Sequence, residues 1–413
     1  MDGEKREEQA QNTAEEAVRP RLGKADLILS LIAVLLCGCV LSGAIPAAWI
    51  FLASAALFAY VVVAVRNIGA VIQILLVSVI VTAVTFLPVV GTAVLALIIG
   101  AGALAWLFLT LPKCKRAPVA LLAVAYGLGF LVTSNPVTPL LCLTFLPAAI
   151  LLAWSHARDI GRTNTIIHTF LGFLISILAA LCVVLWRAYG GINYDILMRF
   201  IDEIKQLFVT IVGEMGKMLW ETLEAASAQA PLPAETMQKL KEAYEVAFAE
   251  GNLQVIADAV VGLTPALITA PGLILSYLAD VVLLRKYYNT EWRMQMTPAA
   301  CTLTVSPATG VVYTICFVII LFATKQSVFL MTVNNLFLIL LPGLFLTGVN
   351  VVLHGARRAR GWQGVVSILL LVAAFCCMGI SGFYFIALWG AYTTVAAELH
   401  QKMLQKLKEK NDK

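Results

Sequence analysis

Long hydrophobic runs, separated by short polar breaks, make up most of the chain from residue 26 onward. Twelve of these runs approach the ~20 residues that an α-helix needs to cross a bilayer. The expected spans are residues 26–44, 47–65, 68–87, 89–111, 117–133, 139–154, 166–186, 261–284, 307–324, 327–353, 363–380 and 383–399. Because the shortest runs could be tilted, re-entrant or merged, the pattern allows about nine to twelve helices. It predicts an all-α, polytopic transmembrane helical bundle.

One long polar stretch, residues 188–260, interrupts this pattern. Within residues 195–226, apolar positions recur at gaps of three and four, which places them on one face of a helix. Asp195 is the expected N-cap, and a second helix is expected to run to Glu250 with Gly251 as its C-cap. The stretch therefore predicts an amphipathic helical hairpin that packs over the outer face of the bundle. The alternative is a lid or a module that docks a partner.

These patterns divide the chain into five parts. They are a disordered cytoplasmic tail at residues 1–24, an N-terminal transmembrane part of about seven helices at 25–187, the extracytoplasmic segment at 188–260, a C-terminal transmembrane part of about five helices at 261–399, and a basic cytoplasmic tail at 400–413.

The composition agrees with a membrane protein and excludes a soluble enzyme. Hydrophobic residues make up 61% of the chain and charged residues only 13%, against about 45–50% and about 25% in soluble domains. The mean hydropathy is +0.90. The long runs also lack the alternation of a membrane β-barrel.

The distribution of basic residues predicts the orientation. With a cytoplasmic N-terminus and alternating connections, 22 of the 29 Lys and Arg residues fall on the inner side. Both termini are then cytoplasmic. Residues 188–260 carry eleven acidic and five basic residues, a net charge of −6, on the outer side. We expect a multi-pass protein of the bacterial cytoplasmic (inner) membrane, with the lipid bilayer as its first partner.

The sequence contains no complete catalytic or metal-binding motif. Gly379-Ile-Ser381-Gly382 spells the serine motif of rhomboid proteases, but the only later histidine, His400, is expected at the opposite end of the last helix, so a tight hairpin explains the motif. No phosphate-cradling loop of the Walker type and no His-Glu-x-x-His helix occur, and the cysteines show no metal-type pairing with histidine. We therefore expect a protein that is not an enzyme, with no catalytic residues, no metal, no cofactor and no nucleic-acid partner.

Asp280 is the carboxylate that lies farthest inside a predicted span and is the first candidate for a functional residue. Charged residues inside a bilayer are costly and are commonly functional. Because Asp280 precedes Arg285 by five positions near the inner end of its span, an interfacial ion pair or a carboxylate that reaches inner-face water would also explain it. The functional alternative is a coupling or substrate-orienting carboxylate.

Three asparagines in one predicted span are the remaining candidates for substrate binding. Asn334, Asn335 and Asn350 flank Pro342, which frees a backbone carbonyl, and Gly348 adds room. Such a combination can line a cavity. Hydrogen bonding between helices is the alternative.

The order of motifs in the C-terminal third resembles a known family. Trp292 to Pro298 precedes a pair of apolar helices, Asn335 to Gly343 follows in the next helix, and a basic turn spans Arg357 to Arg360 before a lysine-rich tail. This order is similar to the YybS-like family of predicted bacterial membrane proteins, a domain of unknown function, over roughly residues 25–400.

The YybS-like family looks distantly similar to the substrate-binding subunits of energy-coupling-factor vitamin transporters. The resemblance implies a transporter-like or substrate-binding membrane subunit for a small, mostly uncharged solute. It also implies a separate energising ATPase module as partner. No vitamin-binding motif is present, so no functional residue is carried over. The alternative is a non-enzymatic scaffold or regulatory protein that docks a cell-envelope partner.

Overall fold

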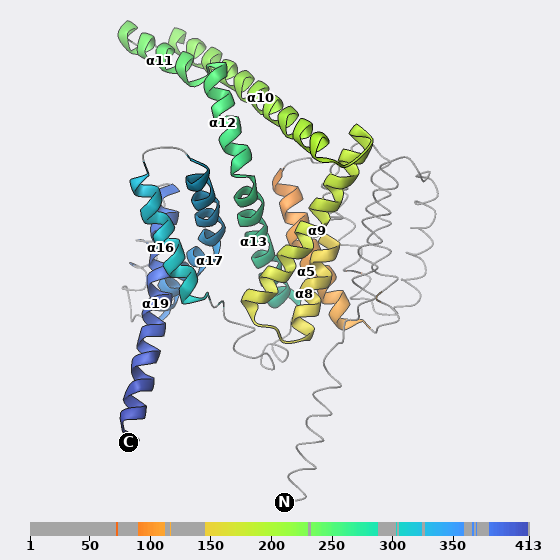
Figure 1. Cartoon of the computed structure of the whole chain (residues 1–413), viewed down its shortest axis with the longest axis vertical. Coiled ribbons are helices and arrows are strands. Elements are labelled where there is room, and N and C mark those ends of the chain that lie inside the picture. The colour runs from red at the N-terminus through yellow and green to blue at the C-terminus, as the bar shows by residue number, and fades with distance from the viewer. Residues whose placement is uncertain are drawn as a thin grey trace, which may run out of the picture.

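A computed structural model describes residues 90–111, 145–229, 233–287, 305–323, 327–358 and 380–411, with the single positions 72, 116, 303, 366 and 369. Within these residues the chain forms ten α-helices and one short π-helix (Figure 1). They are α5 (Val90–Thr110), α8 (Phe145–Ala157), α9 (Arg162–Tyr189), α10 (Tyr194–Gln229), α11 (Ala234–Ala247), α12 (Glu250–Gly262), α13 (Thr264–Val282), η1 (Leu283–Tyr287), α16 (Pro307–Phe322), α17 (Val328–Arg358) and α19 (Ile380–Asn411). The expected all-α class is confirmed for this part of the chain.

Three stretches in the described helices are long and apolar enough to cross a membrane. They are Arg162–Ala179, Thr264–Arg285 and Val328–Val352, and shorter apolar helices occupy Leu97–Thr110, Phe145–Ala157 and Pro307–Phe322. The expected spans at 26–44, 47–65, 68–87, 117–133 and 363–380 lie mostly or wholly outside the described residues. The total of about twelve helices therefore stays a prediction.

The membrane helices pack as two groups that meet along α13 and α17. One group contains α5, α8, α9 and α13, and the other contains α16, α17 and α19 (Figure 1). Close approach depends on glycine: a Cβ at Gly172 of α9 would lie 2.5 Å from Ala148 Cα in α8, and one at Gly390 of α19 would meet the Leu344 carbonyl of α17. Small residues allow such backbone contact in lipid, where packing drives helix association.

The segment from α10 to α12 differs from the predicted hairpin. It contains three helices, because Gly251 lies in the first turn of α12 and does not cap the preceding helix. The side chain of Asn193, and not that of Asp195, accepts a hydrogen bond from the first turn of α10, at 2.8 Å from Ile196 N. α12 is followed almost directly by α13 at Leu263, so the segment is an extension of a membrane helix.

α10 and α11 extend away from one end of the bundle, which we call the outer end (Figure 1). We expected the apolar face of α10 to be buried on the mouth of the bundle. It is not: Ile204, Leu207 and Ile211 are 43%, 59% and 47% exposed. The opposite face of α10 packs on α12 instead.

The C-terminal end of α19 projects from the inner end of the bundle, opposite α10 (Figure 1). α10 and the C-terminal end of α19 thus lie at opposite ends of the bundle, and the assignment of these ends to the two sides of the membrane stays a prediction. The N-terminal tail, residues 1–24, lies outside the described residues.

Candidate functional site

Asp280 is completely buried and bonds two side chains, a histidine and an arginine, from another helix pair. Its Oδ2 accepts a hydrogen bond from Arg162 Nε at 2.8 Å, and its Oδ1 lies 2.8 Å from His156 Nε2. The exposed fractions of the three side chains are 0% for Asp280, 2% for His156 and 12% for Arg162. We call these three residues the inner cluster.

The inner cluster is assembled where α8, α9 and α13 meet at the inner end of the bundle. His156 lies in the last turn of α8, and Arg162 is the first residue of α9. The turn between them reverses the chain through Asp159, whose φ is 53°, a conformation that aspartate tolerates better than most residues. The Ile160 amide closes the turn by donating to the Ser155 carbonyl at 3.0 Å.

The guanidinium of Arg162 is held from two sides. Besides the carboxylate of Asp280, its Cζ lies 5.0 Å from the ring centroid of Tyr277. Tyr277 and Asp280 are three residues apart on α13, so both side chains project from the same helix face. A cation over an aromatic face gains further attraction when it is shielded from water. These two contacts hold the Arg162 side chain of α9 against the surface of α13.

A second polar pair lies beside the inner cluster. Ser155, which is fully buried, places its Oγ 3.0 Å from His168 Nδ1 on the next helix. The His168 ring also packs edge-on against Trp154, with centroids 5.4 Å apart. Trp154 in turn carries Arg158, whose Cζ lies 4.4 Å from the ring centroid. The inner ends of α8 and α9 are therefore joined by polar groups rather than by apolar packing alone.

The Asp280 carboxylate bonds His156 of α8 and Arg162 of α9 at the same time. Buried charges are strongly coupled to their partners because water does not screen them. The inner cluster therefore holds the turn between α8 and α9 against α13.

Asn335 stands at the other end of α13 and serves as a bridge. Its Nδ2 donates to the Gly262 carbonyl at 2.8 Å and to the Met331 carbonyl at 3.1 Å, and its Oδ1 accepts from the Ala266 amide at 3.1 Å. The Gly262 and Ala266 groups lie at the break between α12 and α13, where Pro265 supplies no amide hydrogen, whereas Met331 lies one turn before Asn335 on α17. Asn335 thus satisfies backbone groups that the break leaves unpaired, which fits the alternative of hydrogen bonding between helices.

The other predicted binding residues do not join Asp280. Asn334 is half-buried and Asn350 is exposed, and neither makes a side-chain hydrogen bond among the described residues. Gly348 does not create room: a Cβ there would meet the Ile386 backbone of α19. The four candidates, Asp280, Asn334, Asn335 and Asn350, are therefore spread over both ends of the bundle.

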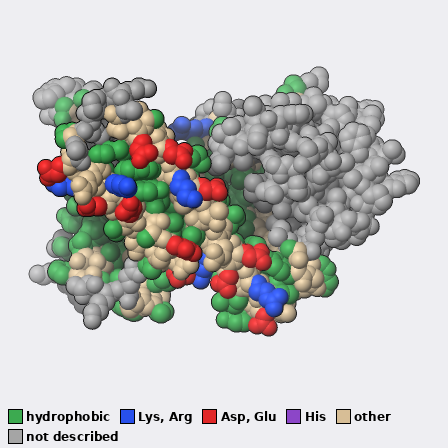
Figure 2. All heavy atoms as spheres, turned by 90° about the horizontal axis from the view of Figure 1, so that it is seen from above, with side chains coloured by type: hydrophobic (Ala, Val, Ile, Leu, Met, Phe, Trp, Pro, Cys, Tyr) green, Lys and Arg blue, Asp and Glu red, His purple; other side chains and the backbone are tan. Residues whose placement is uncertain are grey.

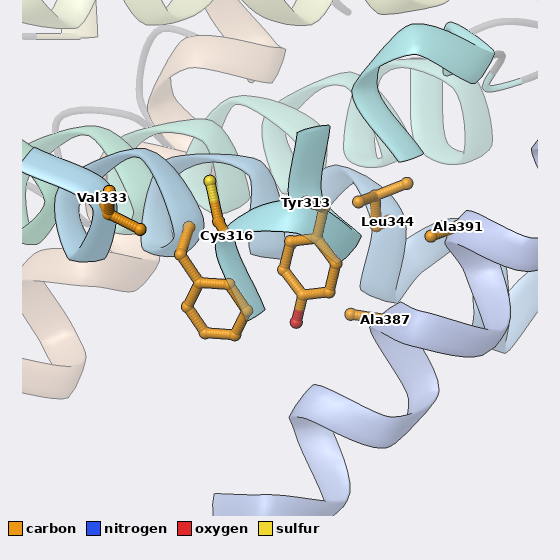
Figure 3. Packing of buried hydrophobic residues seen from close by; sticks show 7 residues of the cluster. Tyr313, Cys316, Val333, Leu344, Ala387 and Ala391 are labelled. Atoms are coloured by element: carbon orange, nitrogen blue, oxygen red, sulfur yellow. The ribbon is translucent and has the colours of Figure 1, made fainter. Parts of the chain in front are cut away.

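A packed apolar cluster lies between α16, α17 and α19 (Figure 3). Tyr313, Phe337 and Leu344 from α16 and α17 are buried there, with Ala387 from α19. The Tyr313 and Phe337 rings stack with centroids 4.5 Å apart. The Tyr313 hydroxyl has no hydrogen-bond partner within the described part of the chain. This region holds α16, α17 and α19 together.

A comparison with models of protein families identifies the family of this chain. The family model described as predicted membrane protein (DUF2232) matches residues 75–391, about three quarters of the chain. The chain belongs to the DUF2232 family. No curated protein and no solved structure gives a significant match. The expected resemblance is confirmed at the level of a predicted membrane protein of unknown function, and no likeness to energy-coupling-factor subunits is shown.

The inner cluster and Asn335 all lie within the matched part of this DUF2232 protein. Sequence reasoning singled out Asp280 but missed His156 and Arg162. A signal for them was present, because the predicted alternation places the connection after the 139–154 span and the end of the 261–284 span on the same membrane side. Two cationic side chains in that short connection were therefore available to a buried carboxylate.

Proposed function

We propose that this DUF2232 protein is a transporter-like subunit of the bacterial cytoplasmic membrane that handles a small, mostly uncharged solute. The observation that supports the proposal is the inner cluster. A carboxylate that is 0% exposed lies in an apolar stretch long enough to cross a membrane, bound by a histidine and an arginine from the adjacent helix pair. Intramembrane ionisable groups of this kind usually mark solute or ion pathways.

The inner cluster would act as the coupling site. It connects α13 to the α8–α9 turn, so a solute that forms hydrogen bonds with it would change the attraction between two helical units. The π-helix η1, which widens the backbone beginning three residues after Asp280, provides a local irregularity where such a movement can start. The chain has no Walker-type loop, so an energising ATPase would be a separate protein.

The proposal can be tested on the full-length protein purified in mild detergent. Small molecules and proteins that co-purify would be identified by mass spectrometry for wild type, His156→Gln and the control Gln254→Ala, an exposed position on α12. Glutamine keeps a hydrogen-bond donor near Asp280 but lacks the imidazole ring. We expect a small molecule that is enriched with wild type and the control and lost with His156→Gln. Equal recovery from all three proteins, or no enrichment over a mock purification, would contradict the proposal.

A scaffold that docks an envelope partner is the second candidate function. The specific observation in its favour is the exposed apolar face of α10 on the outer side. A membrane protein could carry both activities, since the two features lie at opposite ends of the bundle (Figure 1).

A further inference from the structure

α10 has two apolar faces, of which only one packs against other residues in the part of the chain that the structure describes. That face packs on α12 and on the turn before it: Gly216 accommodates the ring of Phe248 in the turn, and Leu253 of α12 is buried. Trp220 stacks on Tyr244 of α11 with ring centroids 5.1 Å apart. These contacts fix α10 along the segment and leave its other side exposed among the described residues.

The second apolar face is exposed along about four turns. Its residues, which we call the α10 stripe, are Ile204, Leu207, Ile211, Met215, Met218 and Leu219, with exposed fractions of 43%, 59%, 47%, 54%, 59% and 63%. The first five follow gaps of three and four, so they form one continuous helix face. The stripe is about 22 Å long. That length matches an amphipathic helix laid alongside it.

One edge of the stripe is mainly acidic, with three glutamates in a row and one base, Lys217, beside them. Glu203, Glu214 and Glu221 are exposed and lie eleven and seven residues apart, which places them in one row along the helix. The Tyr189 hydroxyl donates to Glu203, and this hydrogen bond raises the pKa of Tyr189. Across the helix, Asp258 accepts a hydrogen bond from Lys205 at 2.7 Å and raises the pKa of that ammonium group. Lys205 is therefore engaged on the α12 side, away from the glutamate row.

The surface seen from above is rich in charge. Figure 2 shows acidic and basic side chains interspersed with hydrophobic ones over the described part of this face. The net charge of residues 188–260 is −6. Anionic lipid headgroups would repel such a segment, and helices that lie on membranes carry lysine and arginine beside their apolar face. If two copies of the chain paired through antiparallel α10 helices, the glutamate row of one copy would lie against the same row of the other, and the like charges would repel.

We propose that the α10 stripe is a docking surface for a different protein, which presents an amphipathic helix with an apolar face and a basic edge. Apolar contact along the stripe supplies the attraction. The basic edge lies against Glu203, Glu214 and Glu221, which selects the partner and its direction. The inference deepens the second candidate function by naming the chemistry of the partner.

A pair of synthetic helices of about 21 residues provides the probe. Both carry the same leucine face; one has lysine and the other glutamate along the flanking positions. Binding to full-length protein in nanodiscs of zwitterionic lipid would be measured by fluorescence anisotropy, with empty nanodiscs subtracted. We expect the basic helix to bind at least about tenfold more tightly than the acidic one, and added salt to narrow the difference.

Three variants separate the apolar and electrostatic contributions. Leu207→Glu with Met215→Glu should weaken binding of the basic helix at least about tenfold. Gln206→Glu with Gln254→Glu adds the same charge at exposed sites off the stripe and should not weaken it. Glu214→Lys with Glu221→Lys should reverse the preference between the two helices.

Several outcomes would overturn the proposal. Equal binding of the two helices would show that the glutamate row does not select a basic partner. Unchanged binding of the basic helix to Leu207→Glu with Met215→Glu would show that the α10 stripe is not the binding surface. A photo-cross-linker placed at Leu207 in living cells that reacts only with lipid would identify the membrane as the occupant. His156→Gln should leave peptide binding unchanged, so failure here and failure of the transport proposal are distinguishable.

Discussion

Replacing Asp280 with asparagine removes the negative charge of the inner cluster while keeping its shape. The change leaves the Arg162 guanidinium, which is 12% exposed, without its carboxylate. It also presents an amide nitrogen, a donor, where one carboxylate oxygen accepted a bond from Arg162 or His156 at 2.8 Å. One of the two hydrogen bonds is lost and the other is no longer charge-assisted on the acceptor side.

The expected loss in unfolding free energy is about 3 kcal/mol. Removing one partner of a buried ion pair costs about 3–5 kcal/mol, because the remaining charge stays buried and uncompensated. The lower end applies here since Arg162 retains some exposure and its contact with the Tyr277 ring. A carboxylate that merely reached inner-face water would give a change within about 0.5 kcal/mol.

The assay is an SDS titration of the full-length protein followed by tryptophan fluorescence. Asp258→Asn is the matched control, because this carboxylate also bonds a cation at 2.7 Å but is 65% exposed. Its loss should cost no more than about 1 kcal/mol. If Asp280→Asn and Asp258→Asn give the same small change, the inner cluster is not the buried pair that the geometry implies, and the reasoning fails.

Three further predictions follow from the packing and the orientation. Asn335→Ala strips the α12–α13 junction of its amide bridge and should lower the unfolding free energy by about 2 kcal/mol in the same titration. Gly172→Ala should cost about 1–3 kcal/mol because its methyl would meet the α8 backbone at 2.5 Å, whereas Gly251→Ala, with open space around it, should cost nothing. In a variant without native cysteines, a cysteine at Pro233 should react with an impermeant thiol reagent from outside and one at Lys402 should not; the reverse pattern would invert the topology.

Much of the fold could be predicted because a bilayer restricts the structures that a chain can form within it. Apolar runs of sufficient length must form helices that satisfy their own backbone groups, and this fixed α9 and α17 within a few residues. The end of α9 is also local, since Gly190 adopts φ 76° and closes the helix onto the Trp186 carbonyl. Gly251 misled for the same reason: a glycine after a helical pattern is a common cap, yet here it begins the next helix.

The candidate site could be predicted only in part. A buried carboxylate is visible in the sequence, but its partners, 118 and 124 residues away, depend on how three helices meet. Sequence proximity suggested Arg285, yet this residue lies in η1, beyond the end of α13. The exposure of the α10 stripe was equally hidden, because periodicity reveals an apolar face without revealing what covers it.

α13 is held at both ends by polar bridges. A double variant can test whether these two bridges act independently or are coupled through α13. Ala266, which Asn335 bonds, and Asp280 are fourteen residues apart on α13, about 21 Å along the helix. Perturbations so far apart usually add within about 0.5 kcal/mol unless a shared element couples them. If α13 is rigid and does not couple its two ends, the loss of unfolding free energy in the double variant Asn335→Ala with Asp280→Asn should equal the sum of the losses in the two single variants. A deficit or excess of 1 kcal/mol or more would mean that releasing one end of α13 changes the other, which is what a moving transport helix requires.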